Sequence, residues 1–177
     1  TGGSGNDSMT ATQLDLDTLS FGAGADTLSV TGNVTGSSIT FGGTSYVSVG
    51  NDFLSSTLTG AAGADTFLFG AIVSSSSITL GETSANIVTA SFTSKTTITG
   101  GSGSDTLQIT NDSNKDSLLL GNGSNYASVG GSIASSTLIG GDGVDTVFFA
   151  SANTSTIQLG ASDDDLVFNG IVTGTRA

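Results

Sequence analysis

An aspartate follows a short glycine-rich stretch at several places in the chain. Clear copies are GGSGNDSM from Gly2, GGSGSDTL from Gly100 and GGDGVDTV from Gly140. Ca²⁺ takes six to eight oxygen ligands, and both carboxylates and the carbonyls of glycine turns can supply them. Aspartates stacked about 4.8 Å apart on neighbouring strands would also repel each other by a few kcal/mol per pair, and a divalent cation would remove that cost. The pattern therefore predicts calcium as the cofactor.

The spacing of these aspartates defines two candidate metal sites. One joins Asp7 to Asp26, and the other runs along Asp105, Asn125, Asp145 and Asp164. Asp65 has no acidic neighbour at the matching position, and within Asp163–Asp165 only Asp164 falls in phase, so the others could simply be a solvated turn. The alternative is that each aspartate accepts hydrogen bonds from its own turn and the glycines serve turn geometry alone. The glycines expected to turn carbonyls toward an ion are Gly3, Gly5, Gly101, Gly103, Gly141 and Gly143.

The glycine–aspartate loops are part of a longer sequence repeat. A hydroxyl residue followed by Leu or Ile recurs every 19 or 20 residues, and a glycine or alanine follows about four residues later. A fixed period of about twenty residues indicates a stack of similar coils. The predicted coils start at Thr18, Ser38, Thr57, Ser77, Thr97, Ser117, Thr137 and Thr156.

Apolar residues recur at fixed distances within each coil. Alternation with a period of two indicates strands, and no stretch sustains a helical period. The sequence therefore predicts an all-β chain: a right-handed parallel β-solenoid of about eight coils. The first predicted inward position holds Leu28, Val47, Phe67, Ile87, Leu107, Ala127, Val147 and Leu166; the second, two residues later, includes Val30, Phe69, Ile109, Val129, Phe149 and Phe168; a looser third includes Val34, Leu54, Val73, Ile133 and Val172.

The glycine–aspartate loops resemble the calcium-binding nonapeptide of RTX-type β-rolls, G-G-x-G-x-D-x-U-x. The resemblance implies that loop carbonyls and aspartates of neighbouring turns hold calcium, and that the chain is exported unfolded and folds in extracellular calcium. The family's repeats follow each other every nine residues, whereas Asp65, Asp105 and Asp145 here stand 40 residues apart.

Composition excludes several classes of function. The formal net charge is −12, and the only basic residues are Lys95, Lys115 and Arg176, which argues against nucleic-acid binding. Cysteine and histidine are absent, so Cys/His zinc sites and histidine-based catalytic triads cannot form. No apolar run is long enough to span a membrane. We expect residues 1–177 to form a single repeat domain that is part of a longer chain.

From the sequence we expect this protein to have a structural role rather than a catalytic one. Catalysis is not expected, because the acids lie in repeating turns; the one break in the repeat, Asn111 to Asp116, is interpreted as a solvated loop. In its acidity, lack of cysteine and RTX-like loops the chain resembles bacterial surface-layer, cyanobacterial sheath-fibril and repeat-adhesin proteins. That implies an extracellular, cell-surface location and self-assembly into a lattice or filament, with cell-surface polysaccharide as a further partner. The alternative is an adhesin, or an ice- or glycan-binding module, that uses columns of Ser and Thr such as Thr57/Thr59 and Thr97/Thr99.

Overall fold

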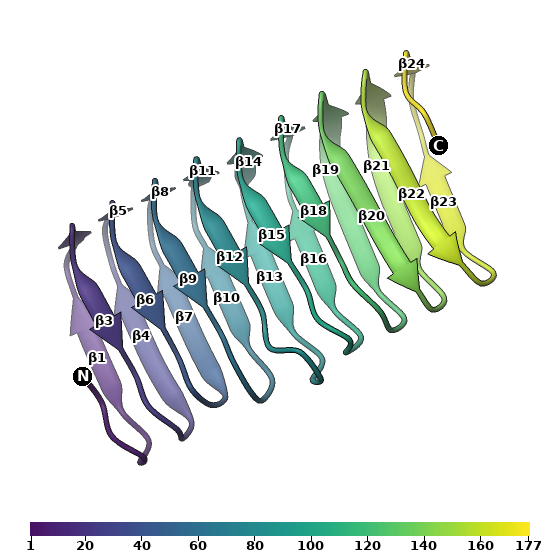
Figure 1. The fold of residues 1–177 in the computed structure, drawn as a ribbon. Coiled ribbons are helices and arrows are strands. Elements are labelled where there is room, and N and C mark those ends of the chain that lie inside the picture. The colour runs from purple at the N-terminus through teal and green to yellow at the C-terminus, as the bar shows by residue number, and fades with distance from the viewer.

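A computed structural model describes residues 1–177 as a parallel β-solenoid. Each coil contributes up to three strands, which pair in parallel with the matching strands of the coils before and after it (Figure 1). The first strand of a coil rises on the far side of the view and the third descends on the near side, while the chain advances from left to right. The coils therefore wind right-handed, as predicted. The structure contains no helix, and hence none that could cross a membrane.

The strands form two sheets. The third strands make an eight-stranded sheet, which we call sheet B, and the first and second strands make a sixteen-stranded sheet, sheet A, that bends round a corner of the coil. The first strands are β1 (Ser8–Ala11), β4 (Asp26–Val30), β7 (Ser45–Val49), β10 (Thr66–Phe69), β13 (Ile87–Ala90), β16 (Thr106–Ile109), the leading parts of β19 (Tyr126–Ala134) and β21 (Thr146–Asn153), and β23 (Asp165–Phe168). The second strands are β2 (Leu14–Asp15), β5 (Val34–Thr35), β8 (Phe53–Leu54), β11 (Ile72–Ser74), β14 (Phe92–Ser94), β17 (Ser113–Asn114), the trailing parts of β19 and β21, and β24 (Val172–Thr173).

The third strands begin at the residues that the sequence repeat predicts as coil starts. These strands are β3 (Thr18–Ser20), β6 (Ser38–Thr40), β9 (Thr57–Thr59), β12 (Ser77–Thr79), β15 (Thr97–Thr99), β18 (Ser117–Leu119), β20 (Thr137–Asp142) and β22 (Thr156–Ala161). The hydroxyl residue pairs with a hydroxyl residue in every neighbouring strand, for example Thr57 with Ser77 and Ser77 with Thr97. The predicted phase of about twenty residues is confirmed.

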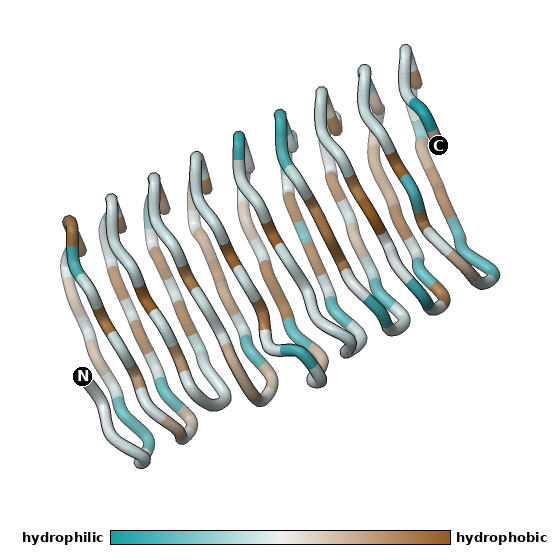
Figure 2. The backbone as a smooth tube through the Cα atoms, viewed as in Figure 1, coloured by the Kyte–Doolittle hydropathy of each residue, from teal (hydrophilic) through white to brown (hydrophobic).

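The core is one continuous apolar column enclosed by the two sheets. Leu or Ile at the centre of each third strand points inward, with Leu58, Ile78 and Leu138 fully buried. Figure 2 shows these hydrophobic residues aligned from coil to coil. Aromatic rings add to the packing, since Phe21 and Phe41 stack with their ring centroids 4.6 Å apart. Burial of this column is the main force that stabilises the coils.

Two predicted inward residues are wrong by one position. Val88, not Ile87, pairs with Phe67 and Leu107 in the first inward column, and Ile87 is 43 % exposed. The loop before β13 is one residue longer than its neighbours, and it absorbs the insertion so that the register of the strand is kept. Likewise Phe53, not Leu54, pairs with Val34 in the third inward column and is fully buried. A slip of one residue would turn every side chain of a strand to the other face, so the loops change length instead.

The segment Asn111–Asp116 is not a solvated loop throughout. Asn111 and Asp112 are exposed, but Ser113 lies in β17 and is fully buried, and Asp116 is 4 % exposed. Ser113 and Thr93 occupy the third inward column, where most coils carry an apolar residue. Each donates a hydrogen bond from its hydroxyl to Oδ2 of Asp116, at 2.7 Å and 2.6 Å. A buried polar cluster therefore replaces part of the apolar core here.

Candidate functional site

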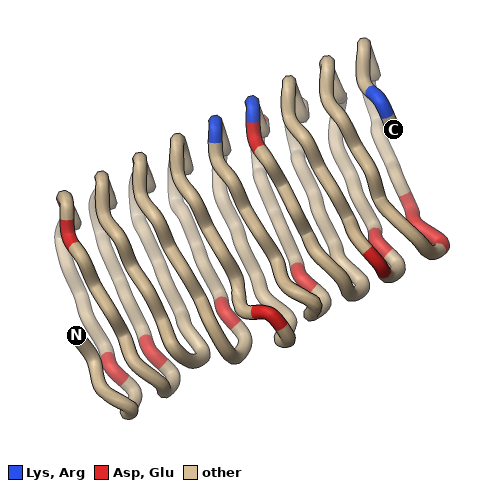
Figure 3. The backbone as a smooth tube through the Cα atoms, viewed as in Figure 1, with Lys and Arg blue, Asp and Glu red and all other residues tan.

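One column of polar side chains runs along the solenoid where each glycine-rich loop enters the first strand. We call it the Asx column, and Figure 3 shows its acidic members as part of a row of acids across the coils near the loops. All members except the two terminal ones are at most 3 % exposed. The column consists of Asp7, Asp26, Ser45, Asp65, Asn86, Asp105, Asn125, Asp145 and Asp164.

Neighbouring members are joined by direct hydrogen bonds. At every step but one, the backbone N–H of one member donates to Oδ1 of the next, so that Asp105 donates to Asn125 at 2.9 Å and Asn125 to Asp145 at 2.9 Å. The same bond joins Asp7 to Asp26 at 2.9 Å and Asp145 to Asp164 at 3.0 Å. The exception is Asp26, whose N–H donates to the backbone carbonyl of Thr44 beside Ser45. The structure thus brings together the members of each predicted site. It also shows that Oδ1 of each acceptor is already engaged by the neighbouring coil.

In four members, Asp7, Asn86, Asp105 and Asn125, the second polar atom of the side chain is bonded to the member's own loop. Oδ2 of Asp7 accepts from the N–H of Gly3 at 2.9 Å, and Oδ2 of Asp105 accepts from the N–H of Gly101 at 3.1 Å. Nδ2 of Asn125 instead donates to the carbonyls of Gly121 and Gly123 at 3.0 Å and 3.1 Å. These bonds hold each loop against the strand that follows it, as the hydrogen-bonding alternative anticipates.

Asp65 is bonded at both oxygens. Its Oδ1 accepts from the N–H of Ser45 at 3.0 Å and from the hydroxyl of Ser45 at 2.6 Å. Its Oδ2 accepts from the N–H of Gly81 at 3.2 Å. Asp65 therefore has a complete structural role within the fold.

Two carboxylates differ from the rest. Oδ2 of Asp26 and Oδ2 of Asp145 are buried and have no hydrogen-bond partner. At Asp145 the cause lies in the loop, because β20 extends through Gly141 and pairs it with Gly160 of β22. The amide that would correspond to Gly101 is thus part of the sheet. An unpaired buried carboxylate oxygen carries its full desolvation cost, and a bound cation would offset that cost.

The predicted glycines allow the loops to stack closely. A Cβ at Gly141 would lie 2.2 Å from the carbonyl oxygen of Gly121, and one at Gly143 would lie 2.3 Å from that of Gly123. Both glycines have φ near +126°, which other residues rarely adopt. Gly101 and Gly103 are equally crowded by the loop before them, whereas Gly3 and Gly5 in the first loop meet nothing within 4 Å. The carbonyls of one loop therefore pack directly against the glycines of the next loop, which leaves no room for a side chain at the crowded positions.

Burial makes negative charge on the column unfavourable. It raises the pKa of Asp65, Asp105 and Asp145 above the ordinary aspartate value, and hydrogen bonds from neighbouring column members and loop amides lower it by less. The carboxylate of Asp164 raises the pKa of Asp145 further. A cation beside Asp145 would stabilise the ionised form of both acids.

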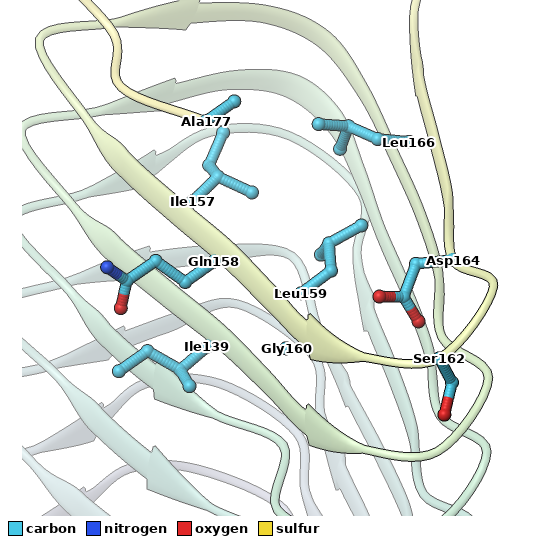
Figure 4. A pocket seen from close by; sticks show the side chains of 9 residues that line it. All are labelled: Ile139, Ile157, Gln158, Leu159, Gly160, Ser162, Asp164, Leu166 and Ala177. Atoms are coloured by element: carbon cyan, nitrogen blue, oxygen red, sulfur yellow. The ribbon is translucent and has the colours of Figure 1, made fainter.

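The free oxygen of Asp145 belongs to a carboxylate, a hard ligand that fits Ca²⁺ better than a softer metal. No three acidic side chains gather at one point. A calcium ion there would take most of its ligands from loop carbonyls and water. Asp164 also lines a hollow of about 710 Å³ at the open end of the apolar column, where Leu159 and Leu166 are partly exposed and Ile157 lies buried behind them (Figure 4).

Sequence reasoning missed two members of the column, Ser45 and Asn86. They stand seven and nine residues after the coil start, whereas the recognised members stand eight after it. Asn86 could have been found from the apolar residue Val88, because the other column members also stand two residues before an inward apolar residue. Because Asn86 donates its N–H to Asp105 and accepts one from Asp65, the column is continuous across the coil that lacks an aspartate.

A second polar column at the opposite corner was also missed. In it the N–H of one residue donates to the side-chain oxygen of its neighbour in the next coil at every step except that from Ser76 to Thr96; Ser37 donates to Ser56 and Asp116 to Ser136, both at 3.0 Å. We call it the corner ladder. Its members are Asp17, Ser37, Ser56, Ser76, Thr96, Asp116, Ser136, Ser155 and Thr175.

No protein-family model matches the chain. Comparison with curated proteins and with solved structures also finds no significant match. The fold is therefore established from the structure itself, as a parallel β-solenoid of about eight coils, consistent with a β-roll.

Proposed function

We propose that this protein is a calcium-stabilised structural rod of an extracellular or cell-surface assembly, such as a surface layer or sheath fibre. The observation that carries the proposal is the Asx column, with buried carboxylates and two unpartnered oxygens on Asp26 and Asp145. The resemblance of its loops to RTX repeats supports calcium as the ion and an exported protein as its setting. Both sheets also run the full length of the molecule, which suits a load-bearing element.

The residues that we propose as calcium ligands are fewer than those predicted from the sequence. Asp26 and Asp145 each offer a free Oδ2, and Asp7 and Asp164 are their bonded neighbours on the column. Glycine carbonyls of the adjoining loops would supply further oxygens. Asp105 and Asn125 use both side-chain polar atoms to hold the fold, so their proposed part is to position the loops.

The decisive experiment replaces the free carboxylate oxygen without disturbing the hydrogen bonds that join the members of the Asx column. Asp145→Asn keeps Oδ1 as the acceptor for Asn125, and its new amide can donate to loop carbonyls as Asn125 itself does. The paired variant Asp26→Asn/Asp145→Asn should fold and show the same melting temperature in calcium as in EDTA. The unmodified protein should melt roughly 5–10 °C higher in calcium, the shift expected for one site at a hundredfold excess over Kd.

The matched control is Asp65→Asn, which makes the same change at a carboxylate whose two oxygens are both already bonded within the fold. It should lose some stability in EDTA and calcium alike, while the shift on adding calcium stays intact. If the unmodified protein melts at one temperature in both solutions, the calcium proposal is wrong.

Self-assembly forms part of the proposal. Within residues 1–177 the outermost strands are β1 to β3 at one end and β22 to β24 at the other, and most of their outer edges pair with no strand of these residues. Arg176 pairs with Thr156 at the start of β22. Equivalent strands run in the same direction at both ends, so one copy could stack on another and continue both sheets. Contacts of this head-to-tail kind produce filaments when they do not close into a ring.

A second candidate function is supported by the outer face of sheet B. Thr18, Ser38, Thr57, Ser77, Thr97, Ser117, Thr137 and Thr156 form an unbroken column of paired hydroxyl residues. A parallel column starts with Ser20 and ends in Leu119, Ile139 and Gln158. Such a face could bind ice or a glycan. Replacement of Thr57 and Thr97 by Lys should abolish adsorption to ice crystals or to a glycan resin if this candidate is right, and melting should stay unchanged.

A further inference from the structure

A slot on the outer face of sheet A differs from the rest of the surface. Two hollows of about 320 Å³ and about 270 Å³ adjoin each other over β19 and share Ser128 and Gly130 as their floor. The small residues of β19 lie between longer side chains of its two neighbours. Gln108 of β16 forms one wall and Phe148 of β21 forms the other.

The slot has the width of a flat ring. β16 and β21 are both paired with β19, so their backbones are separated by two strand spacings, or about 10 Å. Tyr126 closes the lower end, and its ring lies 5.8 Å from that of Phe148 with an interplanar angle of 46°. Asn169, which follows β23 on the far side of β21, also lines one of the hollows.

The lining combines aromatic faces with uncharged hydrogen-bonding groups. Phe148 and Tyr126 offer ring surface, while Gln108, Ser128 and Asn169 offer amides and a hydroxyl. No charged side chain lines either hollow, although the chain carries a net charge of −12. Figure 3 shows the charged residues of the neighbouring coils at the turns, away from this part of the strands.

We propose that this slot binds a short stretch of a neutral polysaccharide. A sugar ring has C–H groups on its faces and hydroxyls at its edge, so it can lie against an aromatic wall while its hydroxyls bond to the amides opposite. A polyanion would be repelled by the net charge of the protein, and a cation would find no carboxylate here. The site is independent of the calcium column and of the hydroxyl face of sheet B, and it would attach the rod to a glycan matrix.

The test is binding of cellohexaose, laminarihexaose and maltohexaose, followed by NMR shifts of the ring protons of Tyr126 and Phe148. At least one of these sugars should shift both rings with saturation. Ser128→Leu should reduce affinity at least tenfold, because it fills the floor with the side chain that Leu68 places in the same outward column. Phe148→Thr, which removes the aromatic wall, should do the same.

The control is Tyr46→Thr, which removes the equivalent of Tyr126 from a coil without a slot. It should bind like the unmodified protein, and circular dichroism should confirm that every variant folds. The proposal is overturned if none of the three sugars shifts the rings, if Ser128→Leu binds equally well, or if oligogalacturonate, an acidic glycan, binds more tightly. None of these outcomes bears on the melting shift in calcium, so the two proposals fail separately.

Discussion

At the scale of single residues, each coil contains a left-handed residue just before the corner ladder. This position has φ between +50° and +60° in every coil, yet only two of its occupants are glycine. A residue with a Cβ is strained in this conformation by about 1–2 kcal/mol. The occupants are Leu16, Gly36, Ser55, Ser75, Lys95, Lys115, Ser135, Thr154 and Gly174.

Leu16→Gly should therefore stabilise the protein. Leu16 is 79 % exposed and loses little packing when it is removed, while glycine adopts its φ of +57° without strain. After the extra entropy of glycine in the unfolded chain, we expect a net gain of about 0.5–1 kcal/mol in urea unfolding. Leu119→Gly, in the extended strand β18, should instead destabilise. A loss of stability in both variants would contradict the strain argument.

Asp116 should make stability depend on pH. Burial raises its pKa, and the hydrogen bonds from Thr93, Thr96 and Ser113 counteract this only in part. The unfolded chain therefore loses the proton of Asp116 at a lower pH than the folded protein does. The contribution of Asp116 to stability is therefore greatest below the ordinary aspartate pKa, about 3.9, and is lost as pH rises through the raised pKa of the folded protein.

The measurement is the melting temperature in EDTA between pH 4 and pH 7. Asp116→Asn should lose less stability over this range than the unmodified protein. Asp112→Asn removes the same charge from an exposed site and controls for the general repulsion of an acidic chain. Equal pH profiles for the two variants would show that Asp116 does not ionise differently on folding.

At the scale of elements, the strand columns predict which side chains the fold depends on. Ile98 and Leu138 occupy the inward column of sheet B and are at most 3 % exposed, whereas Thr99 points outward. Ile98→Ala and Leu138→Ala should each cost about 2–5 kcal/mol, and Thr99→Ala less than about 0.5 kcal/mol. Chemical denaturation measures all three, and similar losses at Thr99 and Leu138 would rule out this register.

The repeat could be predicted from the sequence because every coil buries apolar residues at the same positions against the coils before and after it. An outward hydroxyl residue followed by an inward Leu or Ile fixes the phase of every third strand, and all predicted coil starts agree with the structure. The first strands were harder, because the loops before them vary in length. Ile87 is outward for that reason, since the longer loop before β13 keeps Val88 on the inward face.

The candidate site was only partly predictable. The glycine–aspartate motif marks most of the Asx column, but the partner of each second oxygen depends on loop geometry that spacing does not encode. Asp105 and Asp145 look alike in sequence, yet only Asp145 has an unpartnered Oδ2. Asp116 was hidden because its partners, Thr93 and Thr96, lie in the preceding coil.

At the scale of the whole molecule, the open sheet edges make association between copies testable. Phe168 is 41 % exposed on the edge strand β23, and it stacks on Phe149 of the coil before at 5.9 Å. A coil stacked on this end would bury Phe168 in the same way that Phe168 covers Phe149. Phe168→Lys places a charge at that contact, and charged edge residues oppose strand pairing.

We expect the 177-residue chain to associate into filaments as its concentration rises, with calcium favouring growth because it reduces repulsion between acidic loops. Sedimentation velocity and electron microscopy would detect this. Phe168→Lys should remain monomeric, while Val144→Lys, which makes the same change on an exposed loop, should still associate. Filaments from Phe168→Lys would place the contact elsewhere, and a monomer at every concentration would show that the exposed edges alone do not drive assembly.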